Sequence, residues 1–197
     1  NSTNDEARKH ISDLDNLSVL SAYRQNAGRG QRGNTWSSKA GQNLTFSIIM
    51  KYGEKALQEI RAIDQFAISE IAALATIDFL AAHDIEAKIK WPNDLILSNK
   101  KVCGILTEMF LKENQVDYVV IGVGVNVNVR EFSHELVDKA TSLYMESGET
   151  MDIEPMIEDI VEVFHDQYKK FLEAGDLSFL QAEYNQLLIN QGREVVI

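Results

Sequence analysis

Large apolar residues alternate with other residues in some stretches of the chain and recur at helical spacing in others. The clearest alternation runs over residues 44–50, where Leu44, Phe46, Ile48 and Met50 take every second position. A period of two predicts a half-buried strand. Apolar residues at helical spacing between residues 60 and 77 predict a long helix over about 56–83 that covers one face of a sheet.

The same criteria predict the other elements. We expect strands at 17–23, 88–91, 94–97, 101–111, 116–128 and 193–197, and helices from a cap at residues 2–4 to about 16, and at 133–145, 153–172 and 177–188. The polar residues 112–115 join two strands as a β-hairpin. Because strands precede helices without strict alternation, we expect an α+β fold with a mixed, largely antiparallel sheet and helices packed on one face.

Composition excludes several classes of protein. A net charge of −11 argues against a nucleic-acid surface, which needs a basic face. No run of about eighteen apolar residues predicts a membrane span. A single cysteine, Cys103, excludes an internal disulfide framework and fits a reducing compartment, so we expect a cytoplasmic protein.

Residues 27–36 form a polar loop with three glycines, two arginines and Trp36. Gly28 to Gly33 match the dinucleotide pattern G-x-G-x-x-G, but neither a helix nor the required acidic residue follows, so that assignment fails. A surface turn is the alternative. An exposed tryptophan in a mobile loop has no side chain to pack against. A charged aromatic ligand would stack on the tryptophan and bind to the arginines. The loop therefore predicts closure over a ligand such as a nucleotide.

The strand at 116–128 has two unequal faces. Its odd positions from Val119 to Val127 are apolar, whereas Gly122, Gly124 and Asn126 take even positions. Glycines inside a strand indicate close approach by a ligand or by other backbone, and packing against a helix is the equal alternative. Asn126 favours a ligand, because a buried amide needs hydrogen-bond partners.

A third cluster contains Asn93 and Asp94 after a proline, and Lys101 a few residues later. An Asn-Asp pair after proline ordinarily forms a turn, and a pair of lysines is ordinarily solvated. Here both pairs lie between apolar strands. Asp94 then suits a hydrated Mg²⁺ and Lys101 a phosphate or carboxylate, although composition alone assigns neither role. The four histidines lack metal-ligand spacing, and no nucleophile motif supports covalent catalysis.

Taken in chain order, these motifs resemble the catalytic core of the biotin protein ligases. They are Ser2-Thr3-Asn4, residues 25–33 with Trp36, Lys90-Trp91-Pro92-Asn93-Asp94, residues 101–106 and residues 122–126. The resemblance implies a class II synthetase-like fold and an enzyme that uses ATP and Mg²⁺ to form biotinyl-5′-AMP. Biotin then passes to a lysine of a biotin carboxyl carrier protein domain, from acetyl-CoA carboxylase or a related carboxylase.

The resemblance also implies domains and site residues. Residues 1–190 would form the catalytic domain without its first strand, and residues 191–197 would begin a small C-terminal β-barrel; no DNA-binding region is expected in this chain, and homodimerisation stays open. The implied biotin site comprises Ser2, Thr3, Gln25, Gly28, Arg29, Gly30, Lys101, Gly122 and Gly124. Nucleotide-binding residues would be Arg32, Trp36, Asn93 and Asn126, with Asp94 at Mg²⁺. Arg29, Arg32 and Lys101 would be catalytic, because they face developing negative charge.

Two positions depart from the resemblance. Gln31 and Asn34 stand where many relatives carry basic residues, so we expect the loop to hold an adenylate less tightly. Two other functions stay open: lipoate or octanoate transfer on a related fold, and a non-catalytic biotin or nucleotide sensor. Ligand competition separates the first from biotin ligation, and mutation of Lys101 separates the second.

Overall fold

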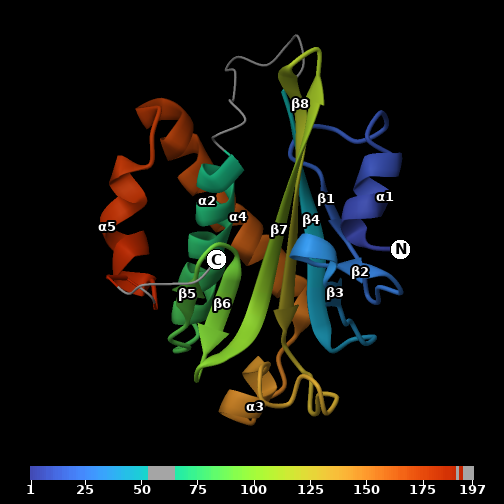
Figure 1. Ribbon diagram of the computed structural model, residues 1–197, viewed down its shortest axis with the longest axis vertical. Helices are drawn as coiled ribbons and strands as arrows, with labels where there is room; N and C mark the ends of the chain where they lie inside the picture. Colours follow the sequence, from blue (N-terminus) through green and yellow to red (C-terminus); the bar gives the residue numbers. More distant parts are fainter. Residues whose placement is uncertain (53–64, 190, 193–197) are drawn as a thin grey trace.

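A six-stranded sheet forms the centre of the molecule in the computed structural model, which describes residues 1–52, 65–189 and 191–192 (Figure 1). The strands are β1 (Val19–Ser21), β4 (Asn43–Lys51), β5 (Lys88–Lys90), β6 (Asp94–Leu97), β7 (Lys100–Lys112) and β8 (Gln115–Asn126). Their order is β1-β4-β8-β7-β6-β5, and each neighbouring pair is antiparallel. The predicted α+β class is confirmed.

Helices cover the sheet unequally. On one side, α2 (Gln65–Ala81) and α4 (Ile153–Ala174) pack against each other and against the sheet, and α5 (Ser178–Leu187) lies beside them (Figure 1). On the opposite side, the short α1 (Thr3–Lys9) packs on β4 and β8. A further short helix, α3 (Leu143–Ser147), lies beyond one end of the sheet. The face that carries α1 is therefore only partly covered by helix.

Strand alternation separates the two faces as the sequence predicts. The odd positions of β8, among them Val119, Ile121 and Val123, join the main core under α2 and α4. Val120, at an even position, packs instead with Ala7 of α1 and Ile49 of β4. The even positions further along β8 are Gly122, Gly124 and Asn126, so this face loses its apolar side chains midway along the strand.

The hairpin between β7 and β8 turns at Glu113 and Asn114. Both residues have left-handed backbones, with φ of 51° and 68°. Two successive positive φ values are typical of the type I′ turn, whose twist matches that of a two-residue hairpin. The prediction of a β-hairpin with polar residues at its turn is confirmed.

Several predicted boundaries were wrong. The helix expected at 133–145 is reduced to α3, because the backbone of residues 139–141 pairs with Lys101 in the sheet instead. The first helix ends at Lys9 rather than near residue 16, and the strand expected at 17–23 is only Val19–Ser21. Residues 56–64 of the predicted long helix and the predicted strand at 193–197, with its β-barrel, lie outside the described residues. None of the helices that the structure places has the length and apolar character needed to cross a membrane.

Candidate active site

A cavity of about 500 Å³ lies on the sheet face that carries the glycines. It brings together most of the residues singled out from the sequence: Ser2, Thr3, Gln25, Arg29, Gly30, Arg32, Trp36, Asn93, Asp94, Lys101, Gly122 and Gly124. Asn4, Trp91 and Gly104 also line it. Residues as far apart in the chain as Ser2 and Gly124 thus converge on one site.

The glycine-rich segment is an ordered ribbon over this cavity. Its strands β2 (Gly28–Arg29) and β3 (Thr35–Trp36) pair antiparallel, and a 3₁₀ turn, η1 (Gln31–Gly33), joins them. The Gly30 amide donates to the Asn34 carbonyl at 2.7 Å. We call residues 28–36 the glycine ribbon.

Gly28 does not line the cavity, contrary to its predicted place in the biotin site. It is buried, and a Cβ there would collide with the carbonyl oxygen of Trp36 across the ribbon. A glycine at this position therefore permits the two strands of the ribbon to approach each other. The close approach of the two strands accounts for a glycine at this position, so Gly28 is not evidence for a ligand.

Trp36 is not the exposed side chain that the sequence analysis assumed. It is half-buried, and its indole lies on the bare backbone of β7 and β8. A Cβ built on Gly124 would lie 2.6 Å from Cε2 of Trp36, and one on Gly104 would lie 3.2 Å from its Cζ3. The indole Nε1 is buried and has no hydrogen-bond partner among the described residues. The glycines of the sheet thus provide the packing partner that this tryptophan was expected to lack.

One end of the cavity is lined by hydrogen-bonding groups from α1 and its surroundings. The Thr3 amide donates to Gln25 Oε1 at 2.7 Å, and Ser47 Oγ lies 2.7 Å from Thr3 Oγ1 and 2.6 Å from Asn4 Oδ1. Ser2 caps α1 by accepting from the Asp5 amide, so its hydroxyl proton is still available. Asn4 Oδ1 lies closest to the position that a Cβ of Gly122 would take. This polar end suits a ligand with its own donors and acceptors.

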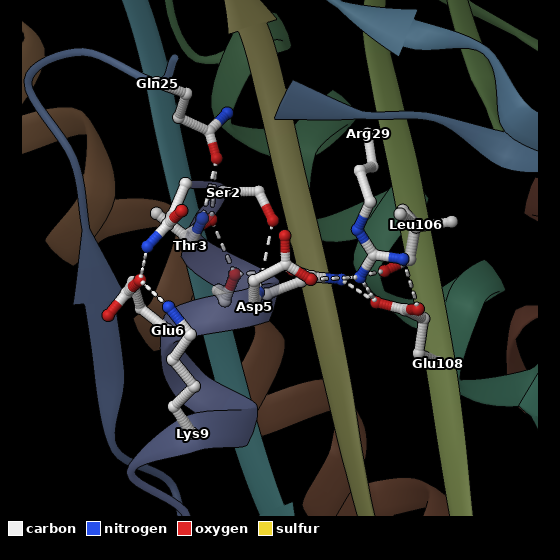
Figure 2. Close-up of polar contacts among 12 residues, drawn as sticks. Ser2, Thr3, Asp5, Glu6, Lys9, Gln25, Arg29, Leu106 and Glu108 are labelled. Carbon is white, nitrogen blue, oxygen red and sulfur yellow. Dashed lines mark hydrogen bonds and ion pairs between the residues drawn. The ribbon is translucent and has the colours of Figure 1, made fainter. Parts of the chain in front are cut away.

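Arg29 leaves the ribbon toward β7 rather than toward open solvent. Its guanidinium Nη1 and Nη2 donate to Oε1 and Oε2 of Glu108 at 3.0 and 2.7 Å, and Nη2 lies 3.0 Å from Asp5 Oδ1 (Figure 2). Burial disfavours the charged form of Arg29. The hydrogen bonds to Glu108 and the negative charges of Glu108 and Asp5 favour it more strongly, so the pKa of Arg29 is raised. Glu108 was not among the residues predicted from the sequence, although its even position on β7 places it on the same face as Gly104.

Lys101 and Asp94 form an ion pair at the other end of the cavity. Nζ lies 2.5 Å from Asp94 Oδ1 and 5.7 Å from the centre of the Trp36 ring. Two features orient Lys101: the register with β6 shifts beside it, and its amide and carbonyl bond to Lys139 and Thr141. A bulge re-aims the neighbouring side chains of a strand. The expectation that Asp94 and Lys101 point to one site is confirmed by this geometry.

The two asparagine candidates have structural partners. Asn93 lines the cavity and donates to the Ile105 carbonyl at 2.9 Å. Asn126 lies behind the lining: it is only 4% exposed, accepts from Asn43 Nδ2 at 2.9 Å and donates to the Thr141 carbonyl at 3.0 Å. These bonds satisfy the buried amide, so its position on the strand gives no argument for a ligand. Burial raises the pKa of Cys103 to about 12, which keeps this thiol from acting as a nucleophile.

The described residues contain no group of three His, Cys, Asp or Glu side chains able to hold a metal ion together. Asp94 is the carboxylate that lines the cavity, and it is paired with Lys101. Mg²⁺ commonly binds through one or two carboxylates together with substrate phosphates. The donor set therefore fits a Mg²⁺ that arrives with a nucleotide rather than a resident ion.

Comparison with known proteins places these features in one family. The model of the biotin/lipoate A/B protein ligase family matches residues 1–126. The chain is 35% identical over 160 residues to the bifunctional ligase/repressor BirA of Bacillus subtilis, and 32% identical over 169 residues to the biotin–[acetyl-CoA-carboxylase] ligase of Paracoccus denitrificans. These alignments cover 80% and 83% of this chain, and 47% and 68% of those proteins. The chain thus spans about half the length of the BirA proteins it matches.

Solved structures show the same arrangement. The biotin protein ligase of Aquifex aeolicus, in complex with biotin and ATP, superposes with a TM-score of 0.81 at 26% identity. The match covers 96% of this chain and 75% of that one. The fold of this chain is therefore shared with a protein whose structure was solved in complex with biotin and ATP.

Proposed function

The chain belongs to the biotin/lipoate A/B protein ligase family, and from this premise we propose that it is an ATP-dependent biotin protein ligase. It would form biotinyl-5′-AMP and transfer biotin to a lysine of a biotin carboxyl carrier protein domain. The observation that carries the proposal is the single cavity that joins a polar end at Thr3 and Gln25 to a charged end at Lys101. Biotinyl-5′-AMP likewise has a hydrogen-bonding ureido ring at one end and a charged phosphate further along its length.

The polar end supports biotin rather than lipoate or octanoate. The ureido ring of biotin carries two N–H donors and a carbonyl acceptor, whereas a dithiolane ring or an alkyl chain carries none of these. The hydroxyls of Ser2 and Thr3 and the amide of Gln25 line this end. The Ser2 hydroxyl proton and the Gln25 Nε2 group have no partner among the described residues, and leaving either unpaired against an apolar ligand costs about 1–3 kcal/mol, which favours biotin in a competition.

Activation of biotin requires no protein nucleophile. A biotin carboxylate oxygen attacks the α-phosphorus of ATP, the bond from that phosphorus to the bridging oxygen breaks, and pyrophosphate leaves. Lys101 and Arg32 line the cavity and would stabilise the negative charge that accumulates on the phosphoryl oxygens. In the second step the acceptor lysine attacks the acyl carbon, loses a proton and releases AMP.

The nucleotide would lie under the glycine ribbon. We infer that Trp36 covers the adenine, that Asn93 and Asn126 lie on the nucleotide side, and that Asp94 binds Mg²⁺ together with the phosphates. Asn126 would first have to give up its bonds to Asn43 and Thr141. The half-buried indole supports the role of Trp36, because a tryptophan that already packs on glycine backbone can present a ring face to an incoming adenine.

The partner and the compartment follow from the same proposal. A carrier domain of a biotin-dependent carboxylase is the acceptor, as the name of the Paracoccus relative suggests for that protein. We infer a cytoplasmic location, which the single reduced and buried Cys103 supports.

A direct assay tests the proposal. The purified chain is incubated with Mg-ATP, biotin and a biotin carboxyl carrier domain, and labelled carrier is detected by mass spectrometry. We expect a mass increase of one biotin on the acceptor lysine, which excess unlabelled lipoate does not suppress. If a well-folded sample neither labels the carrier nor binds biotin, the proposed function is wrong. Biotin binding without adenylate formation would instead indicate the sensor.

A further inference from the structure

Glu108 binds two parts of the site with one carboxylate. Both of its oxygens accept from Arg29 of the glycine ribbon (Figure 2). Oε2 also accepts from Asn4 Nδ2 at 2.9 Å. Its side chain is 22% exposed, so water competes only partly for these bonds. Glu108 does not line the cavity and takes no part in the mechanism above.

The charge of Arg29 is more than balanced where it lies. One guanidinium faces the two carboxylates of Glu108 and Asp5, which gives this cluster a net negative charge. Two of its five N–H donors bond to Glu108, and Nη2 also lies 3.0 Å from Asp5 Oδ1 in an ion pair. Arg29 therefore attracts an anionic ligand less than Arg32 does, which forms no ion pair among the described residues; Lys101 shares its charge with Asp94. The contacts of Arg29 instead tie the ribbon to β7 and α1.

Asn4 is the second group that Glu108 holds. Its Nδ2 donates to Glu108 and to the Leu106 carbonyl, which turns Oδ1 toward Ser47 and the bare backbone at Gly122. Asn4 lines the polar end of the cavity, so its orientation decides which atom a ligand meets there. One carboxylate thus fixes a group in the floor of the cavity and the ribbon above it.

We propose that Glu108 is a positioning residue that closes the glycine ribbon over the cavity through Arg29 and orients the polar end through Asn4. The contact forms without ligand, so the ribbon is held in place before biotin or nucleotide arrives. On the proposed ligase function, the same contact lengthens the time that an acyl-adenylate stays bound.

Trypsin cleavage of the ligand-free chain tests the first part. Trypsin cuts after arginine, and Arg32 lies in the ribbon, so its cleavage reports opening. The Glu108→Gln variant keeps the size of the side chain and one acceptor oxygen, but it loses the charge and places an NH2 donor where the second carboxylate oxygen accepted. We expect cleavage after Arg32 to accelerate about tenfold. Glu158→Gln, on the exposed side of α4, is the matched control and should cleave as the parent does.

Two further measurements separate positioning from a general loss of structure. High salt screens a partly exposed ion pair, so cleavage of the parent should rise toward that of Glu108→Gln, whose own rate should rise less because only the Arg29–Asp5 pair remains to be screened. Arg29→Lys keeps the charge but loses the two-pronged contact, and should also cleave faster after Arg32. If Glu108→Gln folds normally, as judged by circular dichroism, and keeps the parent's cleavage rate, the proposal is wrong. If Glu108→Gln does not fold, the rate of Arg29→Lys decides in the same way.

A second assay tests retention of the intermediate. With biotin and Mg-ATP, we expect Glu108→Gln to release biotinyl-5′-AMP into solution about tenfold faster than the parent, while the rate of pyrophosphate formation in a single turnover stays within about twofold. An unchanged release rate would contradict the role in retention. A parent that forms no adenylate would contradict the ligase function, and the trypsin result would still decide whether Glu108 holds the ribbon.

Discussion

Gly124 lies directly beneath the indole of Trp36, and replacing it with alanine tests how the ribbon is seated. A Cβ at this position would lie 2.6 Å from Cε2, 2.8 Å from Nε1 and 2.9 Å from Cζ2 of Trp36. Carbon atoms in favourable contact are about 3.5–4.0 Å apart, so either the strand or the indole must shift by roughly 1 Å. The Gly124→Ala substitution thus forces one of two elements to move.

The strand is the more rigid of the two. Gly124 pairs with Thr45 on one side and with Gly104 on the other, in the middle of the sheet. The two residues of β3 pair only with the two of β2. Overpacking costs about 1–3 kcal/mol, and here this cost falls on the seated ribbon. We therefore expect the seated state to weaken by roughly 5- to 140-fold relative to an open one.

Acrylamide quenching of Trp36 fluorescence measures this change. The chain has two tryptophans, so the experiment is done in a Trp91→Phe background. We expect Gly124→Ala to raise the quenching constant while the melting temperature stays unchanged. Gly30→Ala is the control within the ribbon, because its Cβ would meet Asn34 at an ordinary 3.4 Å. Quenching equal to that of the parent, or a fall in melting temperature without increased quenching, would refute the reasoning.

Three other predictions concern charge and buried polar groups. Lys101→Gln should lower the rate of adenylate formation about 10²- to 10³-fold in a single-turnover pyrophosphate assay while circular dichroism stays unchanged, and undiminished turnover would remove Lys101 from the mechanism. Asn126→Ala leaves the Asn43 amide and the Thr141 carbonyl without a partner, so urea denaturation should show a loss of about 1–3 kcal/mol in the free energy of unfolding; no loss would contradict its structural role. Burial raises the pKa of Glu70, so the native state holds this proton to a higher pH than the unfolded chain does. The resulting stabilisation is complete at pH values below the unfolded pKa and is lost as pH rises through the folded pKa. Glu70→Gln should therefore raise the melting temperature at pH 7 and reduce its pH dependence between pH 4 and 7, and an unchanged pH profile would count against this assignment.

The sheet was predictable because burial and strand period coincide in it. Along residues 44–50 and 119–127 one face meets the helices α2 and α4 and the other meets α1 and the cavity, so alternation in the sequence records burial directly. The segment 133–145 was not predictable in this way. Its apolar residues recur at helical spacing, but hydrogen bonds from residues 139–141 to Lys101 keep part of it extended. Such a pairing depends on residues about 40 positions away.

The residue types in the sequence predicted that there is a ligand site, but they did not predict which side chains contact one another in it. Glycines, arginines and Trp36 in one segment, and glycines on one strand face, indicated a ligand site that the cavity brings together. Glu108 was missed because its partners Arg29 and Asn4 lie 79 and 104 positions away. Trp36 was misjudged for a related reason: its packing surface is made of glycine backbone, which carries no hydrophobic signal in a sequence.

The separation of the sheet into two faces has a consequence for directed evolution of ligand specificity. Side chains at Cys103, Ile105, Ile121 and Val123 enter the core, whereas Gly104, Leu106 and Gly122 lie between them on the cavity face. Because a Cβ on Gly104 or Gly122 would meet Trp36 or Asn4, a combinatorial library that varies Trp36 and Asn4 together with the cavity-face positions would reshape the pocket while the interleaved core positions keep their wild-type codons. Selection for a new ligand and selection for folding would then act on different residues of the same two strands.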